Sequence, residues 1–413
     1  MSRELALLEK LEKDLSLKEL QIKSLLTITQ AINDNVSASG LYNMYRSFLS
    51  WELGITHMAL FIPSEDENGL WDCATHINIG EDLQNAEEII PFLRNYKRLH
   101  TVKDEDPEKL HQFDIIIPVF HKYNPIAYSL IGGIKSKEDL YNKIQFITTI
   151  TNIIAVAIEN KRLFKRQIEQ EKYKRELELA KEVQSMLIPG ELPTNERFSL
   201  SMIYKPHYNI GGDYLDYIRF DDNRFAFCIA DISGKGVAAA LLMANFQAMI
   251  QSLIFQYRDL ETFVFALNQS VYRITKSDKF ITFFIAEIDI EKNKVRYVNA
   301  GHYPPVLVNK DGSIQRLDKG CTVIGAFDKL PEIAEETLQF EKDAMLVSFT
   351  DGLAELKSED NVYFEEEDLL GFIKEHSTLT PNEFNQKLLE EIDNFRGEEE
   401  YIDDIAVLTC KLF

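Results

Sequence analysis

Four acidic motifs in the second half of the chain place aspartates beside glycine turns or at the ends of apolar strands. They are GGDYLD (211–216), ADISGKG (230–236), FTDGLAE (349–355) and YIDDIAVL (401–408). A carboxylate at such a position is held rigidly, and hard divalent cations such as Mg²⁺ and Mn²⁺ choose oxygen ligands. Two ions close together need several carboxylates around them to offset their charge. The four motifs together could supply that cage.

Each aspartate taken singly has an ordinary structural interpretation. Asp213 in GGD is typical of a turn in which the side chain bonds neighbouring amides. Asp231 before Ser-Gly has the position of an N-terminal helix cap. Asp351 fits a turn pair with the glycine after it, and Asp403-Asp404 a solvated pair at a strand start. Buried strand ends rarely collect acids without a cation or basic partner, so the combination favours a metal site.

The elements that must position these acids are mostly strands. Apolar segments predict strands at 224–231, 282–290, 294–302, 344–352 and 404–413, with helices between them. The segment EIDIEKNKVRYV indicates a hairpin that turns at Lys292-Asn293. The small apolar residues after ADISGKG indicate a helix.

Residues 31–165 mix helix and strand signals. We predict a helix at 40–53, strands at 57–63, 71–80, 114–120 and 127–135, and a closing helix at 138–164. Turn residues in SEDENG (64–69) and at Asn124-Pro125 favour an antiparallel sheet.

Two helical segments with apolar seams flank this region. In residues 1–30 a seam with spacings of three and four, interrupted by one lysine, fits a coiled coil and an amphipathic helix packed on its own domain equally well. Residues 159–187 contain neither Pro nor Gly, and we predict a linker helix that ends before IPGELP, with a dimeric coiled coil over 166–190. The first seam consists of Leu8, Leu11, Leu15, Ile22 and Leu25 around Lys18, and the second of Tyr173, Leu177, Ala180 and Leu187 around Gln184.

The composition narrows the function classes. The net charge of -22, from 67 acidic and 45 basic residues, argues against a nucleic-acid or anionic-membrane partner. The charged start MSRELALLEK lacks the apolar core of a signal peptide, and the apolar segment 146–159 is shorter than a membrane span, so we expect a cytoplasmic protein. The four cysteines include no CxxC pair, and we expect them to be reduced and mostly buried.

The order of the motifs resembles that of one family. GGDxxD, ADxSGKG before an alanine-rich helix, NAGHxPP (299–305), FTDGLxE and DDIxxL follow one another as in the metal-dependent PPM-type serine/threonine phosphatases. The segment AKEVQSMLIP (180–189) and the SGKG variant point to the bacterial branch that includes the sporulation stage II phosphatase and the stress-response regulators of sigma-factor partner switching. The resemblance covers about residues 175–413.

The resemblance implies a sandwich of two antiparallel sheets flanked by helices, with two Mn²⁺ or Mg²⁺ ions at one end. It implies that Asp213, Asp231 and the Ile232 carbonyl bind the metals. Asp351 and Asp403 would complete the shell of the second ion. The ions would activate a water that attacks phosphorus directly, so no nucleophilic side chain is needed. The implied substrate is a phosphorylated protein, an anti-sigma-factor antagonist.

Three neighbours of these ligands are less constrained by the resemblance. Asp216 and Asp404 either contact the metal ligands without binding a metal themselves or face solvent. Ala406 stands where the family motif commonly has threonine, which removes a hydroxyl but no ligand.

Three further polar residues stand in the same motifs. Ser233 is interpreted as a turn or cap residue rather than a nucleophile, and His302 as structural rather than a metal ligand. Two interpretations of Lys235 remain: it contacts the substrate phosphate, or it is a solvated lysine of the turn.

The helix, sheet and helix order of residues 31–165 resembles a GAF domain, which implies a sensor for an unidentified small ligand or protein. Cys73 and His76 lie three apart in a predicted strand, on opposite faces, which argues against a joint metal site. We hypothesise a parallel homodimer in which residues 175–187 pack on the phosphatase domain (191–413) and set whether its metal site is complete. The expected fold is α+β: a GAF-like antiparallel sheet, a coiled-coil linker helix and an α-β-β-α sandwich.

Two other functions compete with a regulated phosphatase. One is a phosphatase-fold binding module with little or no turnover. The other is a cyclic-dinucleotide cyclase, suggested by GGD after a GAF-like region, although Tyr214-Leu215 replaces the Glu-Phe of that family. The cyclase leaves the three downstream acidic motifs unexplained.

Overall fold

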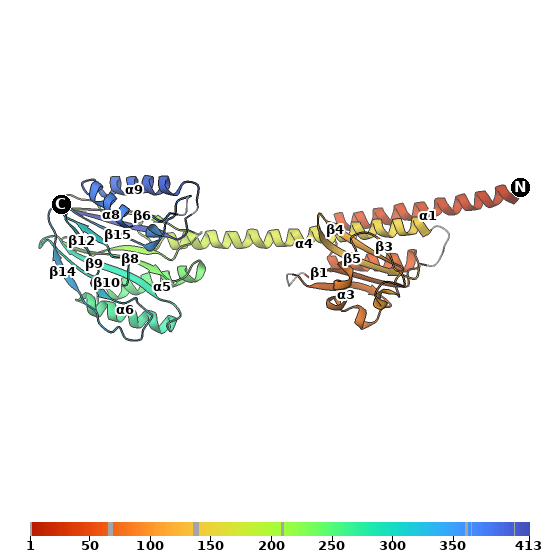
Figure 1. Ribbon diagram of the computed structural model, residues 1–413, viewed down its shortest axis with the longest axis horizontal. Coiled ribbons are helices and arrows are strands. Elements are labelled where there is room, and N and C mark those ends of the chain that lie inside the picture. Colours follow the sequence, from red (N-terminus) through yellow and green to blue (C-terminus); the bar gives the residue numbers. More distant parts are fainter. Residues whose placement is uncertain are drawn as a thin grey trace. The chain divides into compact units, whose positions relative to one another are not determined.

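The computed structural model describes residues 2–64, 69–134, 140–207, 210–359, 362–364, 366–399 and 401–413. The chain forms two compact units, Met1–Lys172 and Tyr173–Phe413. Figure 1 follows the chain through both units by colour. The division between them falls inside helix α4 (Leu140–Ser185), which contains the predicted linker helix as far as Ser185, whereas residues 186–190 of the predicted coiled coil are not helical.

The first unit is built on a five-stranded sheet with the strand order β2-β1-β5-β4-β3. All its strand pairs are antiparallel, which confirms the predicted arrangement. The predicted turn at 64–69 and the first two residues of the predicted closing helix lie largely outside the described residues. The strands are β1 (His57–Pro63), β2 (Trp71–Ile77), β3 (His100–Thr101), β4 (Ile115–His121) and β5 (Asn124–Gly132).

Helices cover both faces of this sheet. On one face, Ile28, Tyr45 and Ile150 pack from α1, α2 and α4 into one apolar cluster. On the other face, Ile89 and Leu93 pack from α3. The predicted helix at 40–53 is present, but it passes into a π-helical turn. The helices are α1 (Ser2–Asn33), α2 (Ala38–Ser47) and α3 (Ala86–Leu93), with a π-helix at Phe48–Glu52 and 3₁₀ turns at Glu81–Leu83 and Glu108–Leu110.

The N-terminal seam is exposed over most of the part of α1 whose side chains are described. Leu11, Leu15 and Ile22 lie in solvent, whereas Ile28 and Ala31 are buried against the sheet. The side chain of Leu8 lies outside the described set. Packing on its own unit therefore accounts only for the last turns of α1, and the coiled coil stays a prediction.

The second unit contains two sheets packed face to face. The first has the order β13-β10-β9-β8-β7, with β14 also paired to β10, and the second has the order β12-β11-β15-β16-β6. The first sheet consists of β7 (Tyr214–Arg219), β8 (Arg224–Ile232), β9 (Ile281–Asp289), β10 (Lys294–Ala300), β13 (Gly320–Cys321) and β14 (Glu336–Gln339). The second consists of β6 (Phe198–Lys205), β11 (Val306–Val308), β12 (Ile314–Arg316), β15 (Ala344–Phe349) and β16 (Ile405–Leu412).

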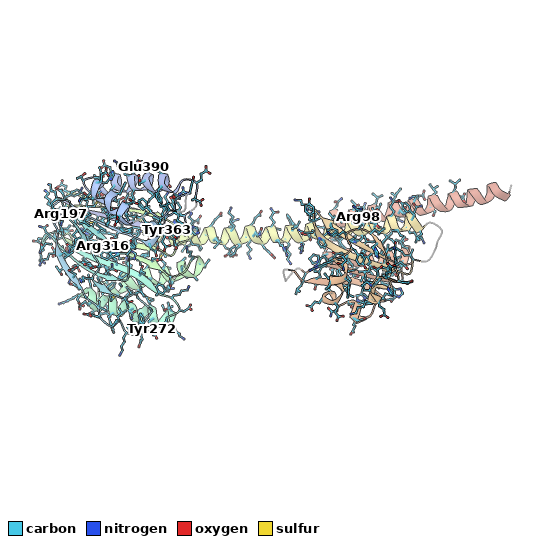
Figure 2. The ribbon with its side chains drawn as sticks, viewed as in Figure 1. Arg98, Arg197, Tyr272, Arg316, Tyr363 and Glu390 are labelled. Carbon is cyan, nitrogen blue, oxygen red and sulfur yellow. The ribbon has the colours of Figure 1, made fainter. Side chains whose placement is uncertain are left out.

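Helices form the two outer layers of the sandwich. Figure 1 shows α5 (Val237–Leu253) and α6 (Leu260–Thr275) beside the first sheet, and α8 (Glu366–His376) and α9 (Pro381–Arg396) beside the second. In Figure 2, Tyr272 and Glu390 mark these two outer layers. Phe246 of α5 packs in one cluster with residues of both sheets, and Phe384 of α9 packs in another against the second sheet.

The strands differ from the predictions in two places. The hairpin of β9 and β10 is confirmed, with Asn293 in the left-handed region of its turn (φ 51°). However, β10 and β13 pair in parallel, so the first sheet is not purely antiparallel. The predicted strand at 344–352 ends at Phe349, because residues Asp351–Ala354 form the short helix α7.

The four cysteines are unpaired, as predicted. Cys228 and Cys410 are buried, and Cys73 and Cys321 are half-buried. None of the helices in the described parts of the chain is long and apolar enough to cross a membrane.

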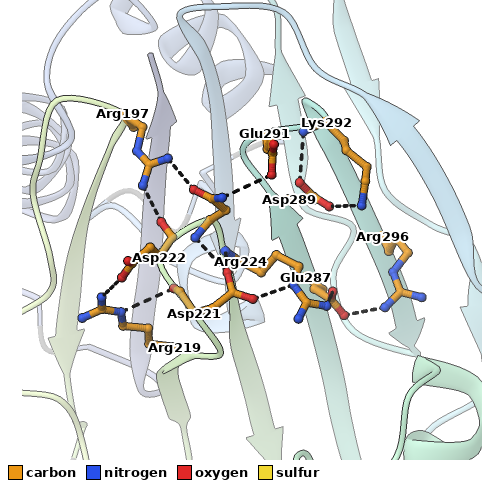
Figure 3. A network of polar contacts seen from close by, with 11 residues as sticks. Arg197, Arg219, Asp221, Asp222, Arg224, Glu287, Asp289, Glu291, Lys292 and Arg296 are labelled. Carbon is orange, nitrogen blue, oxygen red and sulfur yellow. Dashed lines mark hydrogen bonds and ion pairs between the residues drawn. The ribbon is translucent and has the colours of Figure 1, made fainter.

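A surface network of ion pairs lies at one end of the first sheet (Figure 3). Asp221 accepts hydrogen bonds from the backbone of Asn223 and Arg224 in the turn between β7 and β8, and it pairs with the Arg224 side chain at 2.8 Å. Arg296 pairs with Glu287 on the neighbouring strands at 2.5 Å. Exposed pairs such as Asp221–Arg224 stabilise a fold by about 1 kcal/mol or less each. The Asp221 contacts fasten the turn of β7 and β8, at the end that lies away from the acidic motifs.

Candidate metal centre

Two of the predicted ligands come from adjacent strands of the first sheet. Asp213 immediately precedes β7, and Asp231 lies near the end of β8. The pairing of Tyr214 with Ala230 places the two carboxyl groups side by side, because antiparallel partners lie directly opposite each other.

The other two predicted ligands come from the second sheet. Asp351 is the first residue of α7, directly beyond β15, and Asp403 precedes β16. The pairing of Phe349 with Val407 brings these two strand ends together. The charges of Asp351 and Asp403 both act on Asp231. All four predicted aspartates therefore meet at one end of the sandwich.

Burial and mutual repulsion disfavour the charged forms of these acids. Burial raises the pKa of Asp213 well above its ordinary value, and Asp231 and Asp404 raise it further. Burial raises the pKa of Asp231 to about 7, with further contributions from Asp351 and Asp403. The pKa of Asp351 is raised by burial, Glu355 and Asp403. Such a cluster is stabilised by protons or by a cation.

The carboxyl groups of Asp213 and Asp231 lie within hydrogen-bonding reach of each other. The Thr350 hydroxyl donates a hydrogen bond to Asp213 Oδ2 at 2.8 Å and accepts one from the Ala406 backbone at 3.0 Å. Thr350 thus links a carboxyl group of the first sheet to the backbone of the second sheet.

The two glycines of GGD are required by close contacts. A Cβ on Gly211 would lie 2.7 Å from Asp404 Oδ2, and a Cβ on Gly212 would lie 3.0 Å from the Ile232 carbonyl oxygen. Both contacts are tighter than a side chain tolerates without movement. The absence of side chains here lets the GGD loop approach the Ile232 carbonyl, the predicted backbone ligand.

The turn after β8 excludes the helix-cap interpretation of Asp231. The N-cap of α5 is Gly236, and Asp231 still lies in the strand. Gly234 and Gly236 have φ values of 97° and 75°, which favour glycine. Ser233 Oγ accepts a hydrogen bond from the Phe280 backbone at 2.9 Å, which agrees with its predicted role in the turn.

Lys235 lies in the turn with an exposed side chain, and its ammonium group is paired. Its ammonium group lies 2.8 Å from Asp403 Oδ2 and donates a hydrogen bond to the Ile402 carbonyl at 2.9 Å. The other oxygen of Asp403, Oδ1, accepts a hydrogen bond from the Asp404 backbone at 2.9 Å.

Neither Asp404 nor Asp216 is solvent-facing, so that alternative is wrong for both. Asp404 accepts hydrogen bonds from the backbone of His207 at 2.7 Å and of Gly212 at 2.5 Å, and it therefore fastens the loop that carries Asp213. Asp216 is buried away from the cluster, where it accepts hydrogen bonds from Tyr214 Oη, the Tyr217 backbone and Gln251 Nε2.

His302 has a structural position, as predicted. Its side chain is buried, and Nδ1 lies 2.8 Å from the Thr282 hydroxyl. Burial lowers the pKa of His302 to about 4, so the ring is neutral at physiological pH.

Two supporting residues were not predicted from the sequence. Thr350 stands in the quoted FTDG motif, but its bond to Asp213 joins residues 137 positions apart. Gln184 interrupts the apolar seam of the linker helix. Its side chain donates to the Gly211 carbonyl at 2.6 Å and accepts from the Gly211 amide at 3.2 Å. The polar break in the seam was the signal for this contact.

The donor set of the cluster suits a hard cation. It consists of carboxylate and carbonyl oxygens, which Mg²⁺ and Mn²⁺ prefer, and its buried acids repel one another. Within the described residues, no three Asp, Glu, His or Cys side chains converge closely enough to enclose one ion. The donor chemistry therefore fits a hard cation, whereas the described side chains as placed do not enclose one.

Comparisons with known proteins identify relatives of the second unit. Residues 221–413 match the family described as Stage II sporulation protein E (SpoIIE). Over 256 residues the chain is 28% identical to phosphoserine phosphatase RsbU of Bacillus subtilis (strain 168). This match covers 62% of the chain and 75% of RsbU. Over 235 residues it is 26% identical to phosphoserine phosphatase RsbP of the same strain, which covers 56% of each protein.

A solved structure shares the fold. The SiaA-PP2C domain of Pseudomonas aeruginosa superposes with a TM-score of 0.54 at 19% identity, and the match covers 59% of this chain and 99% of that domain. The fold of the second unit is therefore that of a PP2C-like domain.

Proposed function

We propose that this chain is a signal-regulated protein serine/threonine phosphatase, because residues 221–413 match the family described as Stage II sporulation protein E and the chain is similar to two phosphoserine phosphatases. The observation that carries the proposal is the buried acidic cluster at one end of the sandwich, where four strand ends bring Asp213, Asp231, Asp351 and Asp403 together. A cyclase is not supported, because the unit has a PP2C-like fold.

The proposed cofactors are two Mn²⁺ or Mg²⁺ ions. Asp213, Asp231 and the Ile232 carbonyl would bind them, and Asp351 and Asp403 would complete the ligand set of the second ion. When bound, the ions would supply an activated water for direct attack on phosphorus. Oxygen donors and mutually raised pKa values of the acids support this assignment.

The protein's own residues hold the ligands in position. Thr350 orients the Asp213 carboxyl group through its hydroxyl, and Asp404 fixes the preceding backbone at Gly212. Ala406, which replaces the family's threonine, contributes its backbone N–H to Thr350. This backbone contact does not depend on the side chain at position 406.

The proposed substrate is a phosphorylated protein, an anti-sigma-factor antagonist in a partner-switching pathway in the cytoplasm. The similarity to two proteins named phosphoserine phosphatases supports a phosphoserine or phosphothreonine substrate. The net charge of -22 disfavours polyanionic substrates such as nucleic acids.

The proposed sensor is the GAF-like first unit, residues 31–165, with an unidentified small ligand or protein as its partner. Helix α4 would carry the signal, because its C-terminal end touches the GGD loop. Gln184 is buried and forms two hydrogen bonds with Gly211, two residues before Asp213. A rotation of α4 would have to break or move these bonds.

Replacing Gln184 with alanine tests this contact. We expect a stability loss of about 1–2 kcal/mol, since two hydrogen bonds are lost and the buried Gly211 amide and carbonyl lose their partner. We also expect faster hydrogen exchange at residues 210–213 and altered basal activity. Glu182→Ala, at an exposed position of the same helix, is the matched control. Unchanged exchange in the GGD loop of Gln184→Ala would contradict the coupling.

The proposed assembly is a parallel homodimer. Gln184 of the predicted seam faces its own unit, whereas Leu179 and Val183 of α4 are exposed at a spacing of four. An exposed apolar stripe at this spacing suits a coiled coil. Light scattering that gives the mass of one chain at micromolar concentration would contradict the dimer.

A phosphatase assay of the full chain tests the function. We expect release of phosphate from a phosphoserine peptide and from para-nitrophenyl phosphate with Mn²⁺, and none after chelation. Incubation with phosphorylated antagonist proteins from the same genome would then identify the substrate. If no metal-dependent release is found with any of these substrates, the chain is a binding module rather than an enzyme.

A further inference from the structure

Lys235 holds a position that the proposed function does not explain. It lies in the glycine turn between β8 and α5, and its ammonium group reaches across to the other sheet at Asp403. The Lys235 side chain is 44% exposed and that of Asp403 31%, so the ion pair lies at the mouth of the acidic cluster. Lys235 also lowers the pKa of Asp351, which places its charge close to that second carboxyl group.

Both oxygens of Asp403 already have partners. Oδ2 pairs with the Lys235 ammonium at 2.8 Å, and Oδ1 accepts the Asp404 amide at 2.9 Å. The amide is fixed by the backbone at the start of β16, whereas the lysine is a flexible side chain. A metal ion that binds Asp403 would therefore share the carboxylate with the positive charge of Lys235 at Oδ2 and with the amide at Oδ1, and the lysine is the easier partner to move.

Two further contacts hold the lysine in this place. Its ammonium donates to the Ile402 carbonyl, 167 residues away in the sequence. The turn itself is fixed because Ser233 exchanges hydrogen bonds with the Phe280 backbone. Lys235 is thus directed at Asp403 by the fold rather than by chance contact in solvent.

We propose that Lys235 is a tethered cation that competes with the second metal ion for Asp403. The inference rests on the proposed function. The ion held by Asp351 and Asp403 would then bind with lower affinity than the ion held by Asp213 and Asp231, because only the former competes with a positive charge. The released ammonium would remain at the mouth of the cluster, where a phosphoryl group carries negative charge.

Titration of Mn²⁺ into the metal-free full chain, followed by calorimetry, tests this competition without an activity readout. In Lys235→Met we expect the weaker binding event to tighten about three- to tenfold, because an ion pair and a nearby positive charge are removed. Lys235→Arg keeps the charge and should not tighten it. Lys279→Met is the matched control: the Lys279 ammonium lies 2.7 Å from where a Cβ on Gly234 would stand, at the same turn. Among the described residues, no carboxylate pairs with Lys279. We expect a change below about twofold.

The outcomes separate this inference from the proposed function. If wild-type protein binds no Mn²⁺, the proposed metal site fails and the inference with it. If wild-type protein binds two ions but Lys235→Met binds the second no more tightly, only the competition is wrong. An equal effect of Lys279→Met would show a general influence of charge and would also overturn it. Thermal unfolding of each variant with EDTA confirms that the fold is retained.

Discussion

We expect Asp231→Asn to remove metal-dependent phosphatase activity, with a fall in kcat/KM of at least about a hundredfold. Mutation of residues that only support metal ligands already lowers metal affinity or activity by about ten- to a hundredfold. Asp231 is central to the cluster: it is hydrogen-bonded to Asp213 and feels the charges of Asp351 and Asp403. Asparagine keeps the shape of the side chain but cannot offer a charged oxygen. Initial rates with a phosphopeptide over a range of Mn²⁺ concentrations measure the effect.

The same substitution has an opposite effect on the stability of the metal-free protein. The pKa of Asp231 is raised from 3.8 to about 7 in the folded state, so the folded state binds the proton more tightly than the unfolded state. The resulting stabilisation is full below pH 3.8 and is lost as the pH rises through about 7. With EDTA at pH 8, we therefore expect Asp231→Asn to be more stable than wild type by about 2 kcal/mol, and at pH 4 by much less.

Urea unfolding of both proteins at the two pH values measures this difference. Asp368→Asn, at an exposed position on α8, is the control and should leave both the rate and the pH dependence unchanged. An Asp231→Asn protein that retains wild-type turnover, or that is less stable than wild type at pH 8 with EDTA, would contradict the assignment of Asp231 to the metal cluster.

Asp404→Ala damages the site through its backbone, with an expected loss of about 2–4 kcal/mol in stability and of at least about tenfold in activity. The carboxylate is the acceptor for the amides of His207 and Gly212. Alanine leaves both without this partner, and a buried amide without a partner costs about 1–3 kcal/mol. Relief of repulsion with Asp213 and Asp231 offsets part of this loss. Urea unfolding and Mn²⁺ titration measure the two effects.

Asp216→Asn separates loss of the site from loss of the fold. Asp216 is also buried and also accepts several hydrogen bonds, but these come from Tyr214, Tyr217 and Gln251 on the structural side of the sheet. We expect a comparable loss of stability with Mn²⁺ affinity within about twofold of wild type. If Asp404→Ala kept its Mn²⁺ affinity as well, Asp404 would have no role in holding the GGD loop.

Much of the fold followed from local patterns. Most long strands of both units were predicted, because alternating or continuous apolar segments of six to nine residues carry a strong signal, but β6 and β7 were not among them. The short strands β3 and β11–β14 were not, since two to four residues show no period. The strand predicted at 344–352 ended early because Thr350 and Asp351 begin a helix, which the apolar run before them does not reveal.

The sequence by itself predicts which residues carry the proposed chemistry. Acids beside glycines at the ends of apolar strands are a local pattern, and their order along the chain is enough to predict that Asp213, Asp231, Asp351 and Asp403 belong together. Only the tertiary structure decided what holds them. Gln184 reaches Gly211 across 27 residues, Asp404 reaches Gly212 across 192, and Lys235 reaches Ile402 across 167. Such contacts depend on how two sheets pack and where their strand registers place each side chain, and no local pattern in the sequence encodes that distance.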